Sequence, residues 1–212
     1  MKAIAGEHHE VARLLIIHGA SIEEKDTTED IPLISAVMLS YYGMVELLLE
    51  SGSNVEVVDR EGQTLLMKAT GKRYYPIIRL SINHGVNIGA KDLDGNTLLI
   101  RAMDAEHREG AELFINHGAN LDAKDLAGNT SLIWAIAAED QEGAELLINH
   151  GANPEAKDPT RNTFFVNVAL KGNLELARLL ISHGAAVNVT DLSGNRLLMH
   201  AAINQNLELV RL

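Results

Sequence analysis

Hydrophobic and polar positions recur along the chain with a period of 33 residues, without insertion or deletion. Leucine recurs at one position of the 33-residue period, glycine at a second and aspartate at a third. A fixed period of this length indicates identical supersecondary repeats stacked into an array. The phased leucines are Leu14, Leu47, Leu80, Leu113, Leu146, Leu179 and Leu212, and the phased aspartates are Asp26, Asp59, Asp92, Asp125, Asp158 and Asp191.

Within one repeat the pattern predicts a turn, a short helix, a loop and a second helix. The turn formers that follow Asp92 include Gly95, which can take the positive φ that such a turn needs. Thr97 then precedes an apolar segment at residues 98–103 and suits the N-cap of a helix. A second helix is predicted at residues 109–116, where acidic residues come first and bulky apolar residues follow. The phased glycine after it suits a left-handed C-terminal cap.

Counted from each phased aspartate, the chain holds five full repeats, and we predict that residues 1–212 form a single domain. The full repeats are 26–58, 59–91, 92–124, 125–157 and 158–190, and the partial ones are 1–25 and 191–212.

Neither end carries the polar capping repeat that a solenoid usually needs, which is typical of a segment of a longer array or of a designed scaffold. We therefore expect fraying at residues 1–6 and 207–212, exposed apolar surface and end-to-end self-association. The candidate exposed residues are Ile4, Val11 and Leu15 at one end, and Leu198, Leu207 and Val210 at the other.

The motif D-x-x-G-x-T-x-L-x-x-A followed by E-x-x-x-L-L-I-x-H-G-A-N resembles the ankyrin repeat. It is most complete at residues 92–120 and 125–153, and the resemblance extends over essentially all of the 212 residues. The resemblance implies an all-α, ankyrin-type solenoid, in which helix pairs form a right-handed stack and β-hairpin turns project at one side. It also implies a concave surface, which in this family usually binds other proteins.

The chain departs from the family pattern in three respects. Apolar residues replace the histidine of the family's T-P-L-H segment, so we expect the stack to rely on apolar contact there. The hairpin glycine is replaced by Glu29 and Arg161, which leaves the turn type of those two repeats open. The glycine between the helices survives as Gly172, and each left-handed replacement would cost about 1 kcal/mol. Those replacements are Ser40, Arg73, Glu106, Glu139 and Gln205.

Composition narrows the classes of partner. The net charge of −11 argues against nucleic acid and favours a basic protein surface. No signal peptide, transmembrane run or cysteine is present, so we expect no membrane partner and a cytoplasmic location.

The sequence holds no nucleophile elbow, phosphate loop or dinucleotide fingerprint, so we expect neither catalysis nor a cofactor. The repeated histidines do not predict a metal site, because equivalent positions in neighbouring repeats lie about 8–10 Å apart. Two imidazoles that bind one zinc ion each need a nitrogen about 2.0 Å from it. These histidines are His18, His84, His117, His150 and His183.

The candidate partner-binding residues lie where the repeats differ. One first-helix position mixes polar, charged and aromatic types, so we expect it to face the concave groove rather than the core. Trp134 and Arg101 are of the types most enriched at binding hot spots, and Leu126 lies on the adjacent hairpin. The alternative is that Trp134 packs against its own hairpin. The variable position reads Ser35, Lys68, Arg101, Trp134, Asn167 and His200.

A basic, tyrosine-rich stretch that includes Lys72 and Tyr74 is the second candidate, and its alternative is a solvated loop. Together these features predict a non-enzymatic protein-binding module. Two other functions remain open: a structural or designed scaffold that self-associates through its ends, and the regulatory segment of a larger protein.

Overall fold

The structure is a computed structural model that describes residues 8–27, 29–59, 61–159, 162–191, 193–196, 199–200 and 202. The expected fraying at residues 1–6 and 207–212 lies outside the described residues, as do Ile4, Leu198, Leu207 and Val210. The chain divides into two compact units, an N-terminal unit (Met1–Leu93) and a C-terminal unit (Asp94–Leu212). The single domain inferred from the sequence stays a prediction.

Eleven helices form in the described part of the chain, and most repeats contribute a first helix of seven or eight residues and a second of nine. The N-terminal unit holds α2 (His9–Ile17), α3 (Pro32–Met38), α4 (Tyr42–Glu50), α5 (Leu65–Gly71) and α6 (Tyr75–Asn83). The C-terminal unit holds α7 (Leu98–Asp104), α8 (Arg108–Asn116), α9 (Ser131–Ala137), α10 (Gln141–Asn149), α11 (Phe164–Lys171) and α12 (Leu174–Ser182). The helices predicted at 98–103 and 109–116 are thus confirmed to within one residue.

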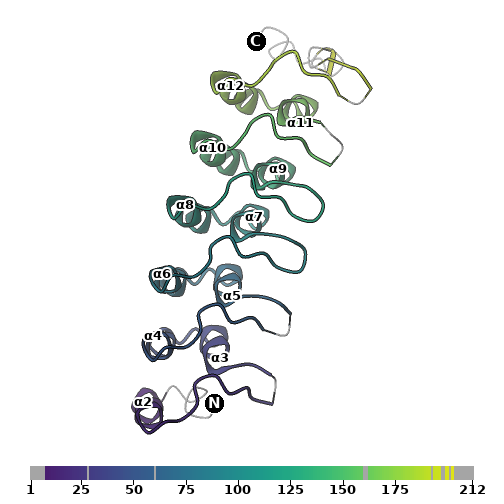
Figure 1. The fold of residues 1–212 in the computed structure, drawn as a ribbon. Helices are drawn as coiled ribbons and strands as arrows, with labels where there is room; N and C mark the ends of the chain where they lie inside the picture. Colours follow the sequence, from purple (N-terminus) through teal and green to yellow (C-terminus); the bar gives the residue numbers. More distant parts are fainter. Residues whose placement is uncertain are drawn as a thin grey trace. The chain divides into compact units, whose positions relative to one another are not determined.

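Within each unit the helix pairs stack in two rows (Figure 1). In the N-terminal unit α3 packs on α4 and α5 on α6, while α3 also contacts α5 and α4 contacts α6. The C-terminal unit repeats this arrangement, with α7, α9 and α11 as the row of first helices. In both units the loops before the first helices extend away from the second helices.

The core lies between the two rows. In α3, α5, α7 and α9 a fully buried leucine is followed three residues later by a small alanine, which lets neighbouring first helices approach closely, whereas α11 has Phe165 and Val168 at these two positions. Of the positions that replace the family's histidine, Ile34, Met67, Ile100 and Val166 are buried, as expected for apolar contact, whereas Ile133 is half-buried and Met199 is 49% exposed.

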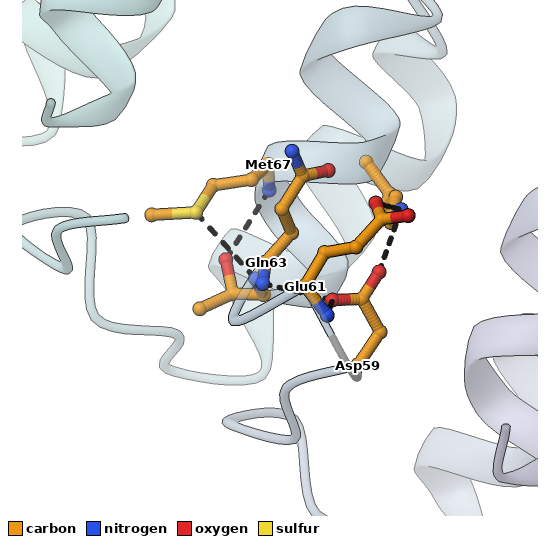
Figure 2. Close-up of polar contacts among 6 residues, drawn as sticks. Asp59, Glu61, Gln63 and Met67 are labelled. Atoms are coloured by element: carbon orange, nitrogen blue, oxygen red, sulfur yellow. Dashed lines mark hydrogen bonds and ion pairs between the residues drawn. The ribbon is translucent and has the colours of Figure 1, made fainter. Parts of the chain in front are cut away.

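The first helices α5, α7, α9 and α11 begin at threonines that differ in what their hydroxyls bind, whereas α3 begins after Ile31. Thr64 accepts a hydrogen bond from the backbone N–H of Met67, and the sulfur of Met67 lies 3.5 Å from the N–H of Thr64 (Figure 2). Thr97 caps α7 in the same way. The hydroxyls of Thr130 and Thr163 are buried and have no hydrogen-bond partner.

The loops between the paired helices take a left-handed conformation, which the sequence left open where the glycine is replaced. Gly172 has a φ of 70°, and the replacements of that glycine have equivalent values although they carry side chains. Glu29, which replaces a hairpin glycine, also has a positive φ of 66°. Arg161 and Gln205 lie outside the described residues. The left-handed loop residues are Ser40 (φ 63°), Arg73 (57°), Glu106 (53°) and Glu139 (60°).

Candidate interaction surface

The phased aspartates close the hairpins that precede the first helices. The backbone N–H of Asp125 donates to the carbonyl of Asn129, and its carboxylate accepts from the N–H of Asn129 at 2.8 Å. Asp59, Asp158 and Asp191 repeat both bonds with the residue four positions later. Antiparallel bridges complete the hairpins at Val58–Thr64, Lys124–Thr130, Lys157–Thr163 and Thr190–Arg196.

The second carboxylate oxygen of these aspartates binds the variable position of the first helix, nine residues later. Four of the six residues at this position thus share an N–H donor that ties the hairpin to the helix, which a comparison of residue types did not show; Ser35 carries a hydroxyl instead. The bonds run from Lys68 to Asp59 (2.6 Å), from Trp134 to Asp125 (2.9 Å), from Asn167 to Asp158 (2.9 Å) and between His200 and Asp191 (2.9 Å).

Figure 2 shows this link around Asp59. Its Oδ1 accepts from the backbone N–H groups of Glu61 at 2.8 Å and Gln63 at 2.9 Å, while Oδ2 pairs with the Lys68 ammonium. The ammonium also lies 3.0 Å from a carboxylate oxygen of Glu61. Lys68, a predicted contact residue, is thus held by two carboxylates of its own hairpin, and its side chain is only 16% exposed.

The hydrogen bonds set the charge of these aspartates. Burial raises the pKa of Asp59, but the hydrogen bonds from Lys68 and from two backbone N–H groups outweigh burial, so its pKa lies below the ordinary value. Burial also raises the pKa of Asp125, but hydrogen bonds from Asn129 and Trp134 outweigh this effect, so its pKa too lies below the ordinary value. Both carboxylates are therefore ionised at neutral pH.

Trp134 is half-buried, and its indole N–H donates to the hairpin of its own repeat. This geometry corresponds to the alternative in which Trp134 packs against its own hairpin. Leu126, next to the aspartate that binds the indole, has 79% of its surface exposed.

The remaining predicted contact residues fall into two groups. In the N-terminal unit, the exposed Lys72 places its ammonium 5.7 Å from the centroid of the half-buried Tyr74 ring, a cation–π contact. In the C-terminal unit Arg101 is half-buried, and His200 is buried against its aspartate.

A ladder of carboxylates, which the sequence reasoning missed, joins neighbouring hairpins. In each case a carboxylate accepts a hydrogen bond from a backbone N–H 31 residues later. Acidic residues at one phase of the repeat were the available signal. The pairs are Glu23 with Asn54, Glu56 with Asn87, Asp122 with Asn153 and Glu155 with Ala186.

Several exposed apolar side chains lie on α2 in the described residues, where Val11 and Leu15 are exposed as expected, together with Leu14 and Ile17. Met38, Leu39 and Tyr42 are exposed where α3 ends and α4 begins. At the hairpin tips, Leu93 of the N-terminal unit is 73% exposed and Leu126 of the C-terminal unit is 79% exposed.

Four of the repeated histidines bind locally at the end of a second helix. Nδ1 of each lies 2.7–3.0 Å from the carbonyl oxygen of the leucine four residues earlier. The four are His18, His117, His150 and His183. Among the described residues, no group of three or more metal-ligating side chains comes together. No helix in the described ranges has the length and apolar character needed to cross a bilayer.

Comparisons with known proteins agree with this architecture. The profile of a family described as ankyrin repeats, in three copies, matches residues 38–125, 66–158 and 132–212. No curated protein sequence matches the chain.

Solved structures match it over most of its length. The ankyrin repeat domain of Bcl-3, described as a unique member of the IkappaB protein family, is 26% identical with a TM-score of 0.86, over 99% of this chain and 96% of that chain. An ankyrin repeat domain from Acinetobacter baumannii AYE is 24% identical with a TM-score of 0.78, over 85% of this chain and 94% of that one, and at this identity it shows the fold alone.

Proposed function

This chain belongs to the ankyrin repeat family, and on that premise we propose that it is a non-enzymatic module that binds a partner protein through its concave groove and hairpin tips. Ankyrin repeats generally act in protein–protein interaction, and the chain has about five of them. The groove is the surface between the first helices and the hairpins.

The observation that carries the proposal is the exposure of leucine at the hairpin tips. Leu126 is 79% and Leu93 is 73% exposed, whereas the aspartates that precede them are half-buried or buried. Leu93 belongs to the N-terminal unit and Leu126 to the C-terminal unit, and each large apolar side chain lies in water, where it adds nothing to the core and is available for contact with a partner.

The residues of the proposed surface have different roles. Leu126 and the accessible part of Trp134 supply apolar contact, and Arg101 occupies the variable position of the preceding repeat. Lys72 and Tyr74 provide a separate candidate contact in the N-terminal unit. Lys68 and His200 are engaged by their aspartates, so they support the hairpins more than they reach a partner; the net charge of −11 favours a partner with a basic surface.

Capture of a partner followed by titration with variants tests this function. Leu126→Asp should weaken binding about 10-fold or more without lowering the melting temperature, because Leu126 makes little contact with its own chain. Trp134→Ala should weaken binding about 30-fold, although it also removes the bond to Asp125. Glu112→Ala, on the exposed side of α8, is the control and should leave affinity unchanged. A loss confined to Glu112→Ala would place the site on the opposite face.

The exposed side chains of α2 favour a second candidate function, self-association with another copy of the chain. Leu14 and Ile17 are 55% and 68% exposed on one nine-residue helix. Sedimentation over a dilution series should then show a dimer that Leu14→Glu and Ile17→Lys each abolish. A strict monomer at high concentration would exclude this function.

A further inference from the structure

A cleft opens in the C-terminal unit between the ends of α9 and α11. It has a volume of about 170 Å³ and is lined by Ile136, Glu139, Val168, Lys171, Asn173 and Leu176. The floor is apolar, because the three aliphatic side chains are buried members of the core. An engineered apolar cavity of about 150 Å³ accommodates benzene, so this volume suffices for one aliphatic side chain. We refer to it as the α9–α11 cleft.

The rim of the α9–α11 cleft binds an ammonium group. Nζ of Lys171 lies 3.0 Å from Oε1 of Glu139 and 3.3 Å from the carbonyl oxygen of Ala137. Ala137 is the last residue of α9, where helix carbonyls lack partners within the helix. The rim thus provides one full negative charge and one free carbonyl for a cation.

Lys171 can leave this position at little cost. Its side chain is 38% exposed and that of Glu139 is 76% exposed, and an exposed ion pair contributes only about 0–1 kcal/mol. A cation from outside can therefore take the place of the lysine.

The preceding junction, between α7 and α9, is built differently. One repeat earlier, alanine stands in place of Lys171 and of Val168, and glycine in place of Leu176. Arg108 there donates to the carboxylates of Asp140 and Glu142. Of these two junctions, the one between α9 and α11 combines an apolar floor with an ammonium group that can be displaced, and the one between α7 and α9 does not.

We propose that the α9–α11 cleft receives one aliphatic side chain of an extended segment of a partner protein. A lysine or arginine next to that side chain displaces Lys171 and binds Glu139 and the carbonyl of Ala137. Charge supports this occupant, because residues 94–212 contain sixteen acidic and nine basic side chains. This inference deepens the proposed function and rests on it.

The proposal fixes the sign of two mutational effects. Lys171 competes with the incoming cation, so Lys171→Ser should strengthen binding of a basic segment. Glu139 binds that cation, so Glu139→Gln should weaken it. An acidic segment that contacts Lys171 directly would produce the reverse pattern, because it would lose its partner in Lys171→Ser.

The test uses two capped peptides, acetyl-Gly-Leu-Lys-Gly-amide and acetyl-Gly-Leu-Glu-Gly-amide, added to the full chain with labelled methyl groups. The lysine peptide should shift the methyl resonances of Ile136, Val168 and Leu176, with a Kd of about 1 mM. Lys171→Ser should lower that Kd about fivefold and Glu139→Gln should raise it about fivefold, whereas the glutamate peptide should shift none of the three.

Lys157→Ser is the matched control, since it removes the same charge from an exposed hairpin position of the same unit. It should leave the Kd nearly unchanged, and thermal melting of all three variants checks that they fold.

Methyl groups that do not respond to the lysine peptide, or a Lys171→Ser variant with equal or weaker binding, would overturn the proposal. Retained sensitivity of partner binding to Leu126→Asp would then leave the proposed function intact. If the lysine peptide binds but Leu126→Asp does not change partner binding, the hairpin tips are excluded as a contact surface and the α9–α11 cleft is retained as a binding site.

Discussion

Single residues set the geometry between the paired helices. In the described part of the chain, four non-glycine residues hold a left-handed backbone there, which costs an L-residue about 1–2 kcal/mol because Cβ approaches the following carbonyl. Packing of the flanking helices compensates this strain, so each such residue marks a position where stability can be gained. Gly172, the equivalent residue in the repeat at 158–190, carries no such cost.

Glu106→Gly should therefore stabilise the protein. Relief of the left-handed strain exceeds the added entropy of glycine in the unfolded chain, so we expect a net gain of about 0.5–1 kcal/mol. Urea denaturation measures the effect. Glu112→Gly, in the middle of α8 with ordinary helical geometry, should instead cost about 1 kcal/mol, and the same sign in both variants would contradict the strain argument.

Threonine hydroxyls at the helix N-termini provide a second comparison of single residues. The Thr97 hydroxyl accepts from the N–H of Ile100, whereas the Thr130 hydroxyl is buried without a partner. Thr97→Val should cost about 1 kcal/mol, and Thr130→Val should be neutral or slightly stabilising. Thermal unfolding of the two variants side by side measures the difference, and equal losses would mean that the Thr130 hydroxyl has a partner after all.

At the scale of the element, the hairpin and the first helix behave as one hydrogen-bonded piece. One carboxylate oxygen closes the hairpin and the other binds the helix nine residues on, so a single aspartate holds both. The carboxylate ladder then joins a hairpin to the next one in the same unit. Exposed loops of this kind are rigid because their backbone groups have partners, which lowers the entropy lost when they bind.

Trp134→Phe should measure this link, because it removes the indole N–H and keeps an aromatic ring, although the smaller ring also loses some packing. The charged acceptor makes the bond worth about 1.5 kcal/mol at pH 7. The folded pKa of Asp125 is lowered from its ordinary 3.8, so its stabilisation is fully present above that value and is lost as the pH falls through the folded pKa. The cost of Trp134→Phe should therefore shrink in acid to the part that comes from lost packing.

Chemical denaturation at neutral pH and well below the ordinary pKa of aspartate tests this pH dependence. Leu126→Ala, on the same hairpin but exposed, should have no effect at either pH. A cost for Trp134→Phe that does not change with pH would show that lost packing, rather than the bond to Asp125, accounts for it.

At the scale of the molecule, stability is the sum of neighbouring helix-pair contacts within each unit, and charge acts against it. The acidic excess of −11 on 212 residues is spread over both units. Like charges repel more in the folded chain than in the expanded one, so a protein of this charge is destabilised at low ionic strength.

Raising NaCl from about 0.01 M to about 0.1 M should therefore stabilise the chain, as the Debye length shortens from about 30 Å to about 10 Å. We expect a gain of about 0.5 kcal/mol, measured by urea denaturation at both salt concentrations. Glu112→Lys, which removes two units of negative charge at an exposed site, should reduce the gain. A loss of stability with salt would indicate that attractive ion pairs dominate instead.

The sequence by itself determined what depends on neighbours along the chain. Helix ends and hairpin aspartates follow from a local pattern, so residues 98–103 and 109–116 could be placed within one residue. Ser40, Arg73, Glu106 and Glu139 could be recognised as replacements of a loop glycine, and the structure showed that they keep its positive φ. Burial of Ile34, Met67, Ile100 and Val166, four of the apolar residues that replace the family's histidine, followed in the same way.

The tertiary structure alone decided which of the variable side chains are held by hydrogen bonds to an aspartate. Lysine, tryptophan, asparagine and histidine have little in common as residue types, but each brings an N–H group to the second oxygen of an aspartate when the hairpin folds over the helix. That requirement is for an N–H group that points towards the aspartate carboxylate, and a comparison of residue types between repeats does not show it. The α9–α11 cleft depends likewise on how Lys171 reaches across to Glu139, 32 residues earlier, because only packing of one repeat on the next brings the two together.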